Sequence, residues 1–240
     1  MKFAVIAAGD GSRLASEGVS VPKPLAEVKG EKLIDRLIRI FMDNDAEEIV
    51  VICNDKTNRV SQHLLQIEED GLKGRPVNLQ FKVKSTPSSM HSFFELSHML
   101  TDAPFVLTTV DTVFKEAEFA DYVSHFKQAV EQGADGLMGV TSFVDDEKPL
   151  WVGTRDDMTI SGFYDQNDAA CRYISAGVYG LTPKALETLA HCVDAGESRM
   201  RNFQRALLTD GFHLTAYAFS KVFDIDHVSD LEKANQFLEP

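Results

Sequence analysis

The sequence predicts an α/β fold, a doubly wound and mostly parallel sheet with a small inserted antiparallel region. Short apolar runs typical of buried strands alternate with segments of helical periodicity up to about residue 140. The first of these runs leads directly into a glycine-rich loop. Between residues 142 and 182, strand-like runs follow one another without a helix. We therefore expect one domain over residues 1–240, with 142–182 as an insertion that packs on the main sheet.

The first half of the chain supplies the regular alternation. A helix over 31–44 is indicated by apolar residues that share one helical face, namely Leu33, Ile34, Leu37, Ile38 and Phe41. The run 77–84 alternates apolar and polar residues, as a strand with one buried face does. The expected elements are strand 3–8, helix 31–44, strand 48–53, helix 58–69, strand 77–84, helix 89–100 and strand 105–110.

The second half of the chain begins with one more helix and strand, and then the alternation of strands and helices stops. The segment 150–164 reads as two hairpin strands around a polar turn, Arg155-Asp156-Asp157. Pro183 marks the start of a helix, because proline fits the first helical position. The expected elements are helix 119–130, strands 135–140, 150–153, 159–164 and 172–182, helices 183–191 and 203–209, strands 213–219 and 222–226, and helix 231–238.

The composition is that of an ordinary globular protein and excludes several functions. Hydrophobic residues make up 44% and charged residues 25% of the 240 residues. The net charge of −13 argues against nucleic acid as a partner, because such binding draws on a broad basic face. No run approaches the ~18 apolar residues of a membrane helix. There is no signal peptide at the start, and three widely spaced cysteines favour a reducing compartment. We expect a cytoplasmic protein without a membrane partner.

The loop after the first strand has the properties of a phosphate-binding loop. Gly9-Asp10-Gly11-Ser12 lets the backbone turn sharply, and successive N–H groups in such a turn form an anion-binding concavity. Arg13 and Lys23 follow and supply positive charge. A P-loop is excluded because it ends in Gly-Lys-Ser/Thr, whereas Gly11-Ser12 is followed here by Arg13-Leu14. The dinucleotide fingerprint is excluded because its third glycine would fall on Leu14.

Two segments at the N-terminus carry a resemblance to a known family. Residues 7–14 read Ala-Ala-Gly-Asp-Gly-Ser-Arg-Leu, and residues 22–25 read Pro-Lys-Pro-Leu. This pair resembles the signature of the sugar-1-phosphate nucleotidyltransferases, A-A-G-x-G-[ST]-R-[LM] followed by P-K-P-L. The resemblance implies a Rossmann-like sheet of the GT-A type and an enzyme that joins a nucleoside triphosphate (NTP) to a sugar 1-phosphate, releasing pyrophosphate. It implies catalytic roles for Arg13 and Lys23, and nucleotide binding by Ala7, Ala8, Gly9, Gly11 and Ser12.

Aspartates near the ends of two strands are the candidates for binding Mg²⁺. Asp111 closes the run 105–110 at the carboxyl end of a strand, where ligands gather in open α/β sheets. The resemblance implies a metal ligand at Asp111, and capping of the following helix is the alternative. It also implies a ligand at Asp224, because a leucine, Leu231, opens the last helix seven residues later; Asp226 is the second candidate. On a strand Asp224 and Asp226 would point to opposite faces, so we expect only one to face the site. Few carboxylates plus phosphate oxygens and waters suit Mg²⁺.

The acceptor site is expected on the segment 174–179, which resembles the Asn-Ala-Gly-Ile-Tyr stretch that lines the sugar pocket of the family. The resemblance implies acceptor contacts by Gly177 and Tyr179, and a glycine within a strand often marks close approach of a ligand. The family's phosphate-gripping lysine is missing from 164–167, and Arg172 or Lys221 are the candidates to replace it. Ser89 falls in the polar loop that contacts the base in the family, and an N-cap is its alternative role.

Two other functions stay open at this point. The loop 88–92 looks more like that of the phosphocholine cytidylyltransferases, for which a non-sugar acceptor would need aromatic faces around its ammonium group. The candidates for those faces are Trp151, Phe163, Tyr164 and Tyr173. The second alternative is a regulatory subunit that binds a nucleotide without turnover. In the favoured reading the partners are an NTP and a phosphorylated small-molecule acceptor, and a homo-oligomer is possible because relatives are often dimers or larger.

Overall fold

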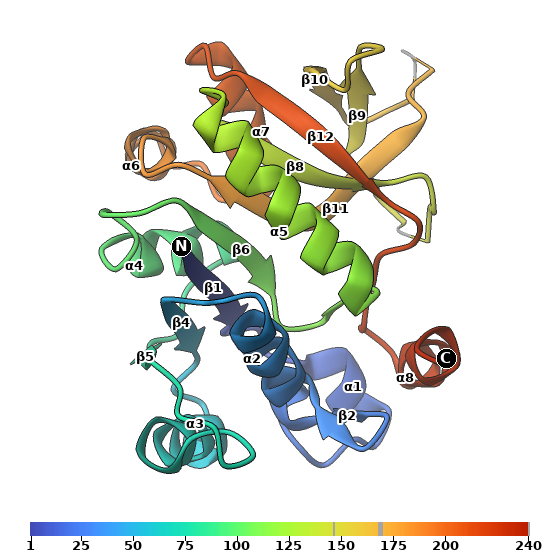
Figure 1. Cartoon of the computed structure of the whole chain (residues 1–240). Coiled ribbons are helices and arrows are strands. Elements are labelled where there is room, and N and C mark those ends of the chain that lie inside the picture. Colours follow the sequence, from blue (N-terminus) through green and yellow to red (C-terminus); the bar gives the residue numbers. More distant parts are fainter. Residues whose placement is uncertain (146, 168–169, 240) are drawn as a thin grey trace.

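The computed structural model describes residues 1–145, 147–167 and 170–239, and its centre is a nine-stranded, mixed but mostly parallel sheet (Figure 1). Its strands follow the spatial order β10-β9-β11-β6-β1-β4-β5, with β8 pairing to β11 and β12 to β8. These strands are β1 (Lys2–Ala7), β4 (Glu48–Cys53), β5 (Leu79–Val83), β6 (Phe105–Thr109), β8 (Gly136–Thr141), β9 (Trp151–Thr154), β10 (Ile160–Tyr164), β11 (Tyr173–Leu181) and β12 (Leu214–Phe219). The predicted α/β class is confirmed.

The first half of the chain forms the parallel part of the sheet, as the alternation of strands and helices predicts. β1 lies between β4 and β6 and is parallel to both, and β5 extends the sheet beyond β4. Every residue of β4 after Glu48 is buried, which explains its unbroken apolar run. The helices of this half are α2 (Leu33–Asp43), α3 (Asn58–Asp70) and α4 (Ser89–Ser97).

The second half adds antiparallel pairs to the same sheet. β11 is antiparallel to β6 on one side and to β8 on the other, and the hairpin β9–β10 continues the sheet from the start of β11. The strand expected at 172–182 therefore lies within the main sheet. The helices of the second half of the chain are α5 (Glu116–Glu131), α6 (Ala185–Asp194), α7 (Met200–Thr209) and α8 (Val228–Phe237). The last two begin three residues earlier than predicted. At α8 the reason is capping, since Asp230 accepts hydrogen bonds from the backbone N–H groups of Asp226 and His227.

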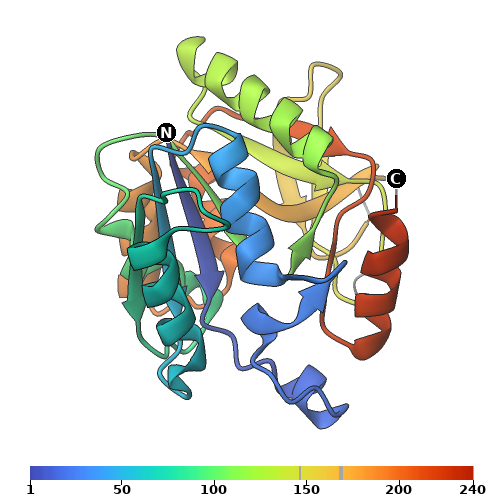
Figure 2. The ribbon, with the colours of Figure 1, turned by 60° about the horizontal axis from the view of Figure 1, so that its bottom comes forward.

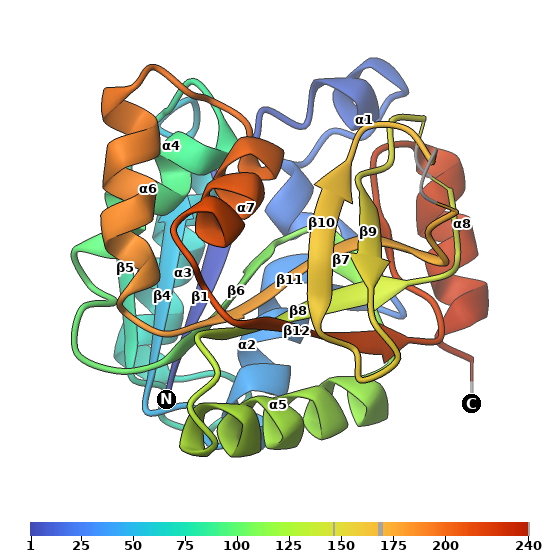
Figure 3. The same cartoon turned by 90° about the horizontal axis from the view of Figure 1, so that it is seen from above.

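The core has two apolar layers, one on each face of the sheet. Figure 3 shows α4, α6 and α7 on one face and α2 and α5 on the other. Phe3, Phe41 and Phe119 belong to the layer under α2 and α5, and Phe93 and Phe203 belong to the layer under α4 and α7. Figure 2 shows α8 beside the N-terminal segment, where Asn235 accepts a hydrogen bond from the backbone N–H of Lys29 at 2.7 Å. None of the helices in the described ranges has the length and apolar character needed to cross a membrane.

Short elements that periodicity does not predict lie close to the chain's polar loops. The predicted strand 222–226 is the two-residue β13 (Phe223–Asp224), and it pairs with β7 (Thr112–Val113) outside the main sheet. The others are α1 (Ser12–Ser16), the 3₁₀ turn η1 (Lys23–Leu25), β2 (Glu27–Val28) and β3 (Glu31–Lys32). These four elements have two to five residues each, too few to produce a hydrophobic period, so no pattern in the sequence marks them.

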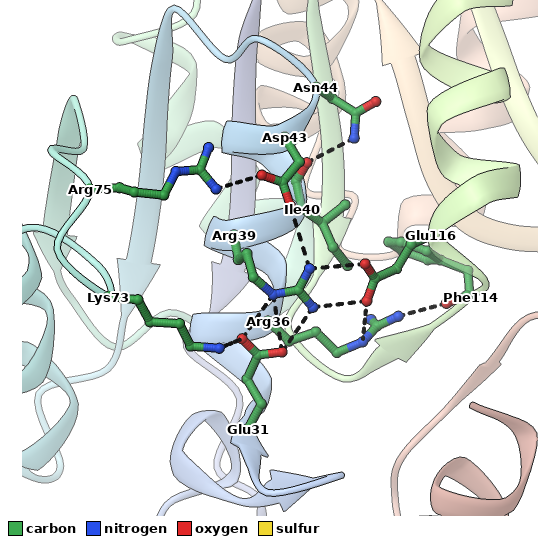
Figure 4. Close-up of polar contacts among 10 residues, drawn as sticks. All are labelled: Glu31, Arg36, Arg39, Ile40, Asp43, Asn44, Lys73, Arg75, Phe114 and Glu116. Carbon is green, nitrogen blue, oxygen red and sulfur yellow. Dashed lines mark hydrogen bonds and ion pairs between the residues drawn. The ribbon is translucent and has the colours of Figure 1, made fainter. Parts of the chain in front are cut away.

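A network of charges fixes α2 against the segment that follows β7 (Figure 4). Arg39 lies between two carboxylates, with its Nη2 2.9 Å from Glu31 and 2.8 Å from Glu116. Arg36 is buried and donates to the carbonyl oxygen of Phe114 at 2.7 Å. Burial lowers the pKa of Arg36 to about 10. Phe114 directly follows β7, so this network positions the short strand next to Asp111.

Replacing Thr108 with valine is expected to raise the free energy of unfolding by about 1 kcal/mol, because a buried hydroxyl without a partner carries an uncompensated desolvation cost. Thr108 is 0% exposed, and its Oγ1 has no hydrogen-bond partner among the described residues. Urea unfolding of both proteins measures the change. Thr188→Val is the matched control. The hydroxyl of buried Thr188 donates to Asp210, so this variant should have a lower free energy of unfolding. A loss of stability in Thr108→Val would contradict the expectation.

Candidate active site

The glycine-rich loop brings Lys23 onto the end of the first strand. Gly11 has a φ of 59°, in the left-handed region that favours glycine, and it stands immediately before α1. A Cβ atom at Gly11 would lie 3.0 Å from the Cβ of Lys23, which is closer than ordinary packing allows. The glycine is therefore required both for the backbone turn and for the approach of the lysine segment. The two parts of the N-terminal signature, residues 7–14 and 22–25, are therefore in contact where Gly11 meets Lys23.

Two carboxylates converge on Lys23, and one of them also pairs with Arg13. The Nζ of Lys23 lies 2.5 Å from Asp111 Oδ2 and 3.0 Å from Asp226 Oδ1. The other oxygen of Asp226 lies 2.6 Å from Arg13 Nη1. Burial lowers the pKa of Lys23, but Asp111 and Asp226 outweigh that effect and hold the pKa above its ordinary value. The lysine therefore stays charged in a site where both carboxylates compensate it.

The short pair β7–β13 holds the aspartates together. Thr112 pairs with Asp224, and the backbone N–H of Ile225 donates to the carbonyl of Asp111 at 3.0 Å. The Thr112 hydroxyl donates to Asp224 Oδ1 at 3.0 Å. Desolvation by the surrounding protein, followed by the negative charge of Asp111, raises the pKa of Asp224 above its usual range. Asp224 also keeps contact with solvent, which limits the rise.

The strand alternation that led us to expect only one of Asp224 and Asp226 at the site does not apply to this segment. β13 ends at Asp224, so Asp226 lies beyond the strand and does not follow its alternation. Asp226 pairs with Lys23 and Arg13, while Asp224 interacts with Asp111. Asp111, Asp224 and Asp226 therefore surround the same small region but have different neighbours.

The predicted acceptor residues divide into those near the aspartates and those elsewhere. Gly177 has a φ of 70°, and a Cβ there would lie 3.7 Å from Thr112 Oγ1, beside the β7–β13 pair. Tyr179 is buried, and this burial raises its pKa to about 12. The guanidinium of Arg172 lies 5.3 Å from the ring centre of Tyr173, and the described residues give it no bond to the loop or the aspartates.

Lys221 is held in an aromatic cage rather than beside the phosphate loop. Its Nζ lies 4.2 Å from the ring centre of Phe143, 5.0 Å from Phe223 and 5.2 Å from Phe237. Phe237 belongs to α8 and Phe223 to β13. The lysine thus joins the C-terminal helix to the aspartate-bearing strand.

The segment near Ser89 is capped by its neighbour. Ser88 is the N-cap of α4, and its hydroxyl accepts a 3.4 Å hydrogen bond from the backbone N–H of His91. The cap role considered for Ser89 is therefore filled by Ser88. Ser89 itself is half-buried in the first turn of α4.

Glu17 and His227 complete the site in a way that the sequence analysis missed. Glu17 lies 2.5 Å from His227 Nδ1 and accepts a 2.7 Å hydrogen bond from the backbone N–H of Val228. The hydrogen bond from His227 lowers the pKa of Glu17, and Glu17 raises the pKa of His227. These bonds fix α1, which carries Arg13, to the start of α8. The two residues are 210 positions apart, so no local pattern could have indicated the contact.

A comparison with protein families identifies the whole chain. The family model described as "Nucleotidyl transferase" matches residues 2–240. The chain belongs to the nucleotidyl transferase family. This confirms the resemblance first seen in the two N-terminal segments, and it confirms a nucleotidyltransferase class at the level of the family.

The curated relatives of this nucleotidyl transferase are named for different sugar phosphates. The UTP–glucose-1-phosphate uridylyltransferase AglF of Haloferax volcanii is 25% identical over 246 residues, covering 100% of this chain and 97% of that protein. The mannose-1-phosphate guanyltransferase of Gibberella zeae is 25% identical over 151 residues, covering 62% of this chain. The match spans only 39% of that longer relative.

Solved structures share the fold of this nucleotidyl transferase. A putative glucose-1-phosphate thymidylyltransferase from Bacillus anthracis superposes with a TM-score of 0.83 at 18% identity, covering 99% of this chain and 94% of that one. The inositol-1-phosphate CTP transferase from T. maritima gives a TM-score of 0.74 at 19% identity, with coverage of 100% and 98%. A UDP-glucose pyrophosphorylase complexed with UDP-glucose gives 0.78 at 16% identity, with coverage of 98% and 97%. The GT-A-like fold is thereby confirmed.

The aspartates of this nucleotidyl transferase fit a divalent cation with few protein ligands. Within the described ranges no group of three or more His, Cys, Asp or Glu side chains is arranged to hold a metal. Asp111 and Asp224 do act on each other, since the charge of Asp111 disfavours ionisation of Asp224. A cation between them would relieve this repulsion, and Mg²⁺ takes its remaining ligands from water and phosphate. Asp226 is already compensated by Arg13 and Lys23.

Proposed function

We propose that this chain joins an NTP and a sugar 1-phosphate to give an NDP-sugar and pyrophosphate in a Mg²⁺-dependent reaction. The observation that carries the proposal is the convergence of Arg13, Lys23 and Asp111 at the glycine-rich loop, with Lys23 Nζ 2.5 Å from Asp111. The curated relatives named for sugar-1-phosphate substrates support the acceptor class. We also propose that residues 1–240 form one nucleotidyltransferase domain in which 142–182 contributes to acceptor binding.

The proposed reaction requires alignment and charge neutralisation more than proton transfer. An oxygen of the sugar phosphate forms a bond to the α-phosphorus of the NTP. The bond from that phosphorus to the β-phosphate bridging oxygen breaks, and pyrophosphate leaves with the electron pair. The attacking group is already an anion, so no general base is needed. The protein has to hold two mutually repelling anions in line and stabilise the developing charge.

The positive groups of the loop are suited to that task. We propose that Ala7, Ala8, Gly9, Gly11 and Ser12 hold the nucleotide, with Ser89 near the base. Arg13 neutralises the leaving pyrophosphate, and Lys23 lies between the α-phosphate and the incoming phosphate. Both side chains bond to Asp226, so their charges are held in position at the loop. Binding the phosphates exchanges these pairs for bonds to the substrates.

Asp111 and Asp224 are the proposed ligands of Mg²⁺. The bound cation would neutralise charge on the α-phosphate. The bond from Thr112 to Asp224 and the pairing of β7 with β13 keep the carboxylates in place. On the acceptor side, Gly177 lies beside Thr112, and we propose that the phosphate group of the acceptor binds near these two residues.

The arrangement of aromatic residues favours a sugar over choline as the acceptor. Phe163 belongs to the buried core, and the ring of Tyr164 packs across Gly153 and Gly162 of its own hairpin. Arg172 lies over the ring of Tyr173. The aromatic cage formed by Phe143, Phe223 and Phe237 already holds the ammonium of Lys221. Phe163, Tyr173 and the three rings around Lys221 thus have partners within the chain, whereas Tyr164 is 38% exposed and Trp151 is half-buried.

The test is pyrophosphate release from the purified chain, with each common NTP paired with hexose 1-phosphates, inositol 1-phosphate and phosphocholine. We expect release with one NTP and a hydroxylated phosphate, and its loss when EDTA removes Mg²⁺. Release with phosphocholine alone would support the cytidylyltransferase alternative. Nucleotide binding without release from any pair would overturn the proposal in favour of a regulatory subunit.

A further inference from the structure

β11 leaves an opening in its strand pairing beside the aspartates. At its start, Tyr173 and Ile174 pair with β9, and from Val178 onward the strand pairs with β6. The register with β8 also shifts between Ser175 and Tyr179. Ala176 and Gly177 therefore have no strand partner on the edge shared by β9 and β6. Because Gly177 faces Thr112, which holds Asp224, this opening borders the proposed site of phosphate transfer.

A buried glutamine from α7 reaches the same opening. Gln204 is 2% exposed, and its amide oxygen accepts a 3.2 Å hydrogen bond from the hydroxyl of Ser175. No described residue bonds to the other end of the amide. Whichever way the amide is turned, one end meets Ser175 and the other end has no partner. Buried amides are almost always satisfied, so a group left unpaired at this place calls for an explanation.

The unpaired end of the amide keeps a small contact with solvent. Thr108 Oγ1 is the only side-chain atom of the described residues that is both fully inaccessible and unpartnered. The free end of Gln204 is therefore not sealed within the core. The neighbouring polar residues of α7 bind elsewhere. Arg201 pairs with Asp165 at 2.6 Å, and Arg205 donates to the carbonyl of Phe163 at 3.1 Å. Both of these bonds fix α7 to the hairpin β9–β10, and Gln204 alone is directed to β11.

We propose that Gln204, supported by Ser175, binds a hydroxyl group of the acceptor and selects the phosphate of a polyhydroxylated compound over phosphocholine. An amide and a hydroxyl offer donors and acceptors that match the hydroxyl groups of a sugar or cyclitol. A trimethylammonium group has neither hydrogen-bond donors nor acceptors, so its binding would leave the free end of the Gln204 amide unpaired. The inference rests on the proposed function and names a specificity-determining residue for it.

The test compares Gln204→Leu with the unchanged protein, using the NTP and acceptor that give the fastest pyrophosphate release. We expect the KM for the acceptor to rise about tenfold, the effect of one lost hydrogen bond, while the KM for the NTP changes less than twofold. The Tm should change little, because the lost hydrogen bond from Ser175 is offset by replacing the unpaired end of a buried amide with an apolar side chain. Gln128→Leu on α5 is the matched control, since Gln128 is exposed and no change is expected.

Deoxy analogues of the acceptor identify the hydroxyl that Gln204 contacts. For one analogue, the KM with the unchanged protein should be about tenfold higher than that of the full acceptor. With Gln204→Leu, the same analogue and the full acceptor should have equal KM values. A lower Tm with an unchanged KM for the acceptor would make Gln204 structural and overturn this inference alone. Preference of the unchanged protein for phosphocholine would overturn the acceptor class. Absence of pyrophosphate release from every pair would instead overturn the proposed function, on which the inference depends.

Discussion

Replacing Lys23 with methionine is expected to lower turnover about 10²–10³-fold, the range seen when one group that stabilises transition-state charge is removed. The side chain of Lys23 is only 10% exposed and contacts both Asp111 and Asp226. Methionine has a similar length but no charge, so the two reacting phosphates would lose the cation between them. The measurement is kcat for pyrophosphate release at saturating concentrations of both substrates.

The control for Lys23 is Lys73→Met. Lys73 is 60% exposed and pairs with Glu31, which keeps Arg39 as a partner when the lysine is lost. An exposed pair of this kind contributes little to stability, and Lys73 has no role in the proposed reaction. Turnover of Lys73→Met should equal that of the unchanged protein. If Lys23→Met folds normally and keeps turnover within threefold, the role assigned to Lys23 is wrong.

Replacing Phe119 with alanine is expected to lower the free energy of unfolding by about 3–5 kcal/mol, the usual cost of truncating a fully buried phenylalanine. Phe119 stacks on Phe114 with ring centres 4.6 Å apart, and it also contacts Phe3, Phe41 and Tyr122. These rings come from β1, α2, α5 and the segment after β7. The cavity would therefore open at a point where four parts of the chain meet.

Guanidinium unfolding of Phe119→Ala measures this cost. Phe94→Ala is the matched control, because Phe94 is a half-buried phenylalanine on α4 and should lose less than half as much. Equal losses at the two positions would show that burial in the aromatic cluster does not decide the effect. A loss below about 1 kcal/mol at Phe119 would mean that the surrounding rings collapse into the space.

The parallel part of the sheet is predictable from the sequence because its signals are local. β4 is a continuous apolar run, and the glycine-rich loop reveals itself by residue type alone. Asp111 is found because it closes an apolar strand. The sequence does not show that Asp226 pairs with Arg13 and Lys23, because that contact depends on how chain segments more than 200 residues apart are folded together.

The acceptor side is less predictable for a different physical reason. Lys221 looks like a free cation in the sequence, and only the structure shows three rings around its ammonium. Gln204 falls on the buried face of α7 with Phe203 and Leu207, but helical periodicity does not indicate which strand it contacts. Its partner Ser175 is brought within reach by the register shift in β11, which depends on pairing with β6, β8 and β9. Such irregular pairing leaves no repeating pattern to detect.

The pairing of Lys23 with Asp226 also sets an order of events during protein synthesis. The two residues are 203 positions apart, so at 5–20 residues per second about 10–40 s pass between their incorporation. In that interval β1, β4 and β5 can already pair, whereas Arg13 and Lys23 still lack the carboxylate that compensates them. The glycine-rich loop is thus made well before it can reach the arrangement seen in the structure. A nascent chain brings Lys23 and Asp226 together only when the segment leading into α8 has left the ribosome.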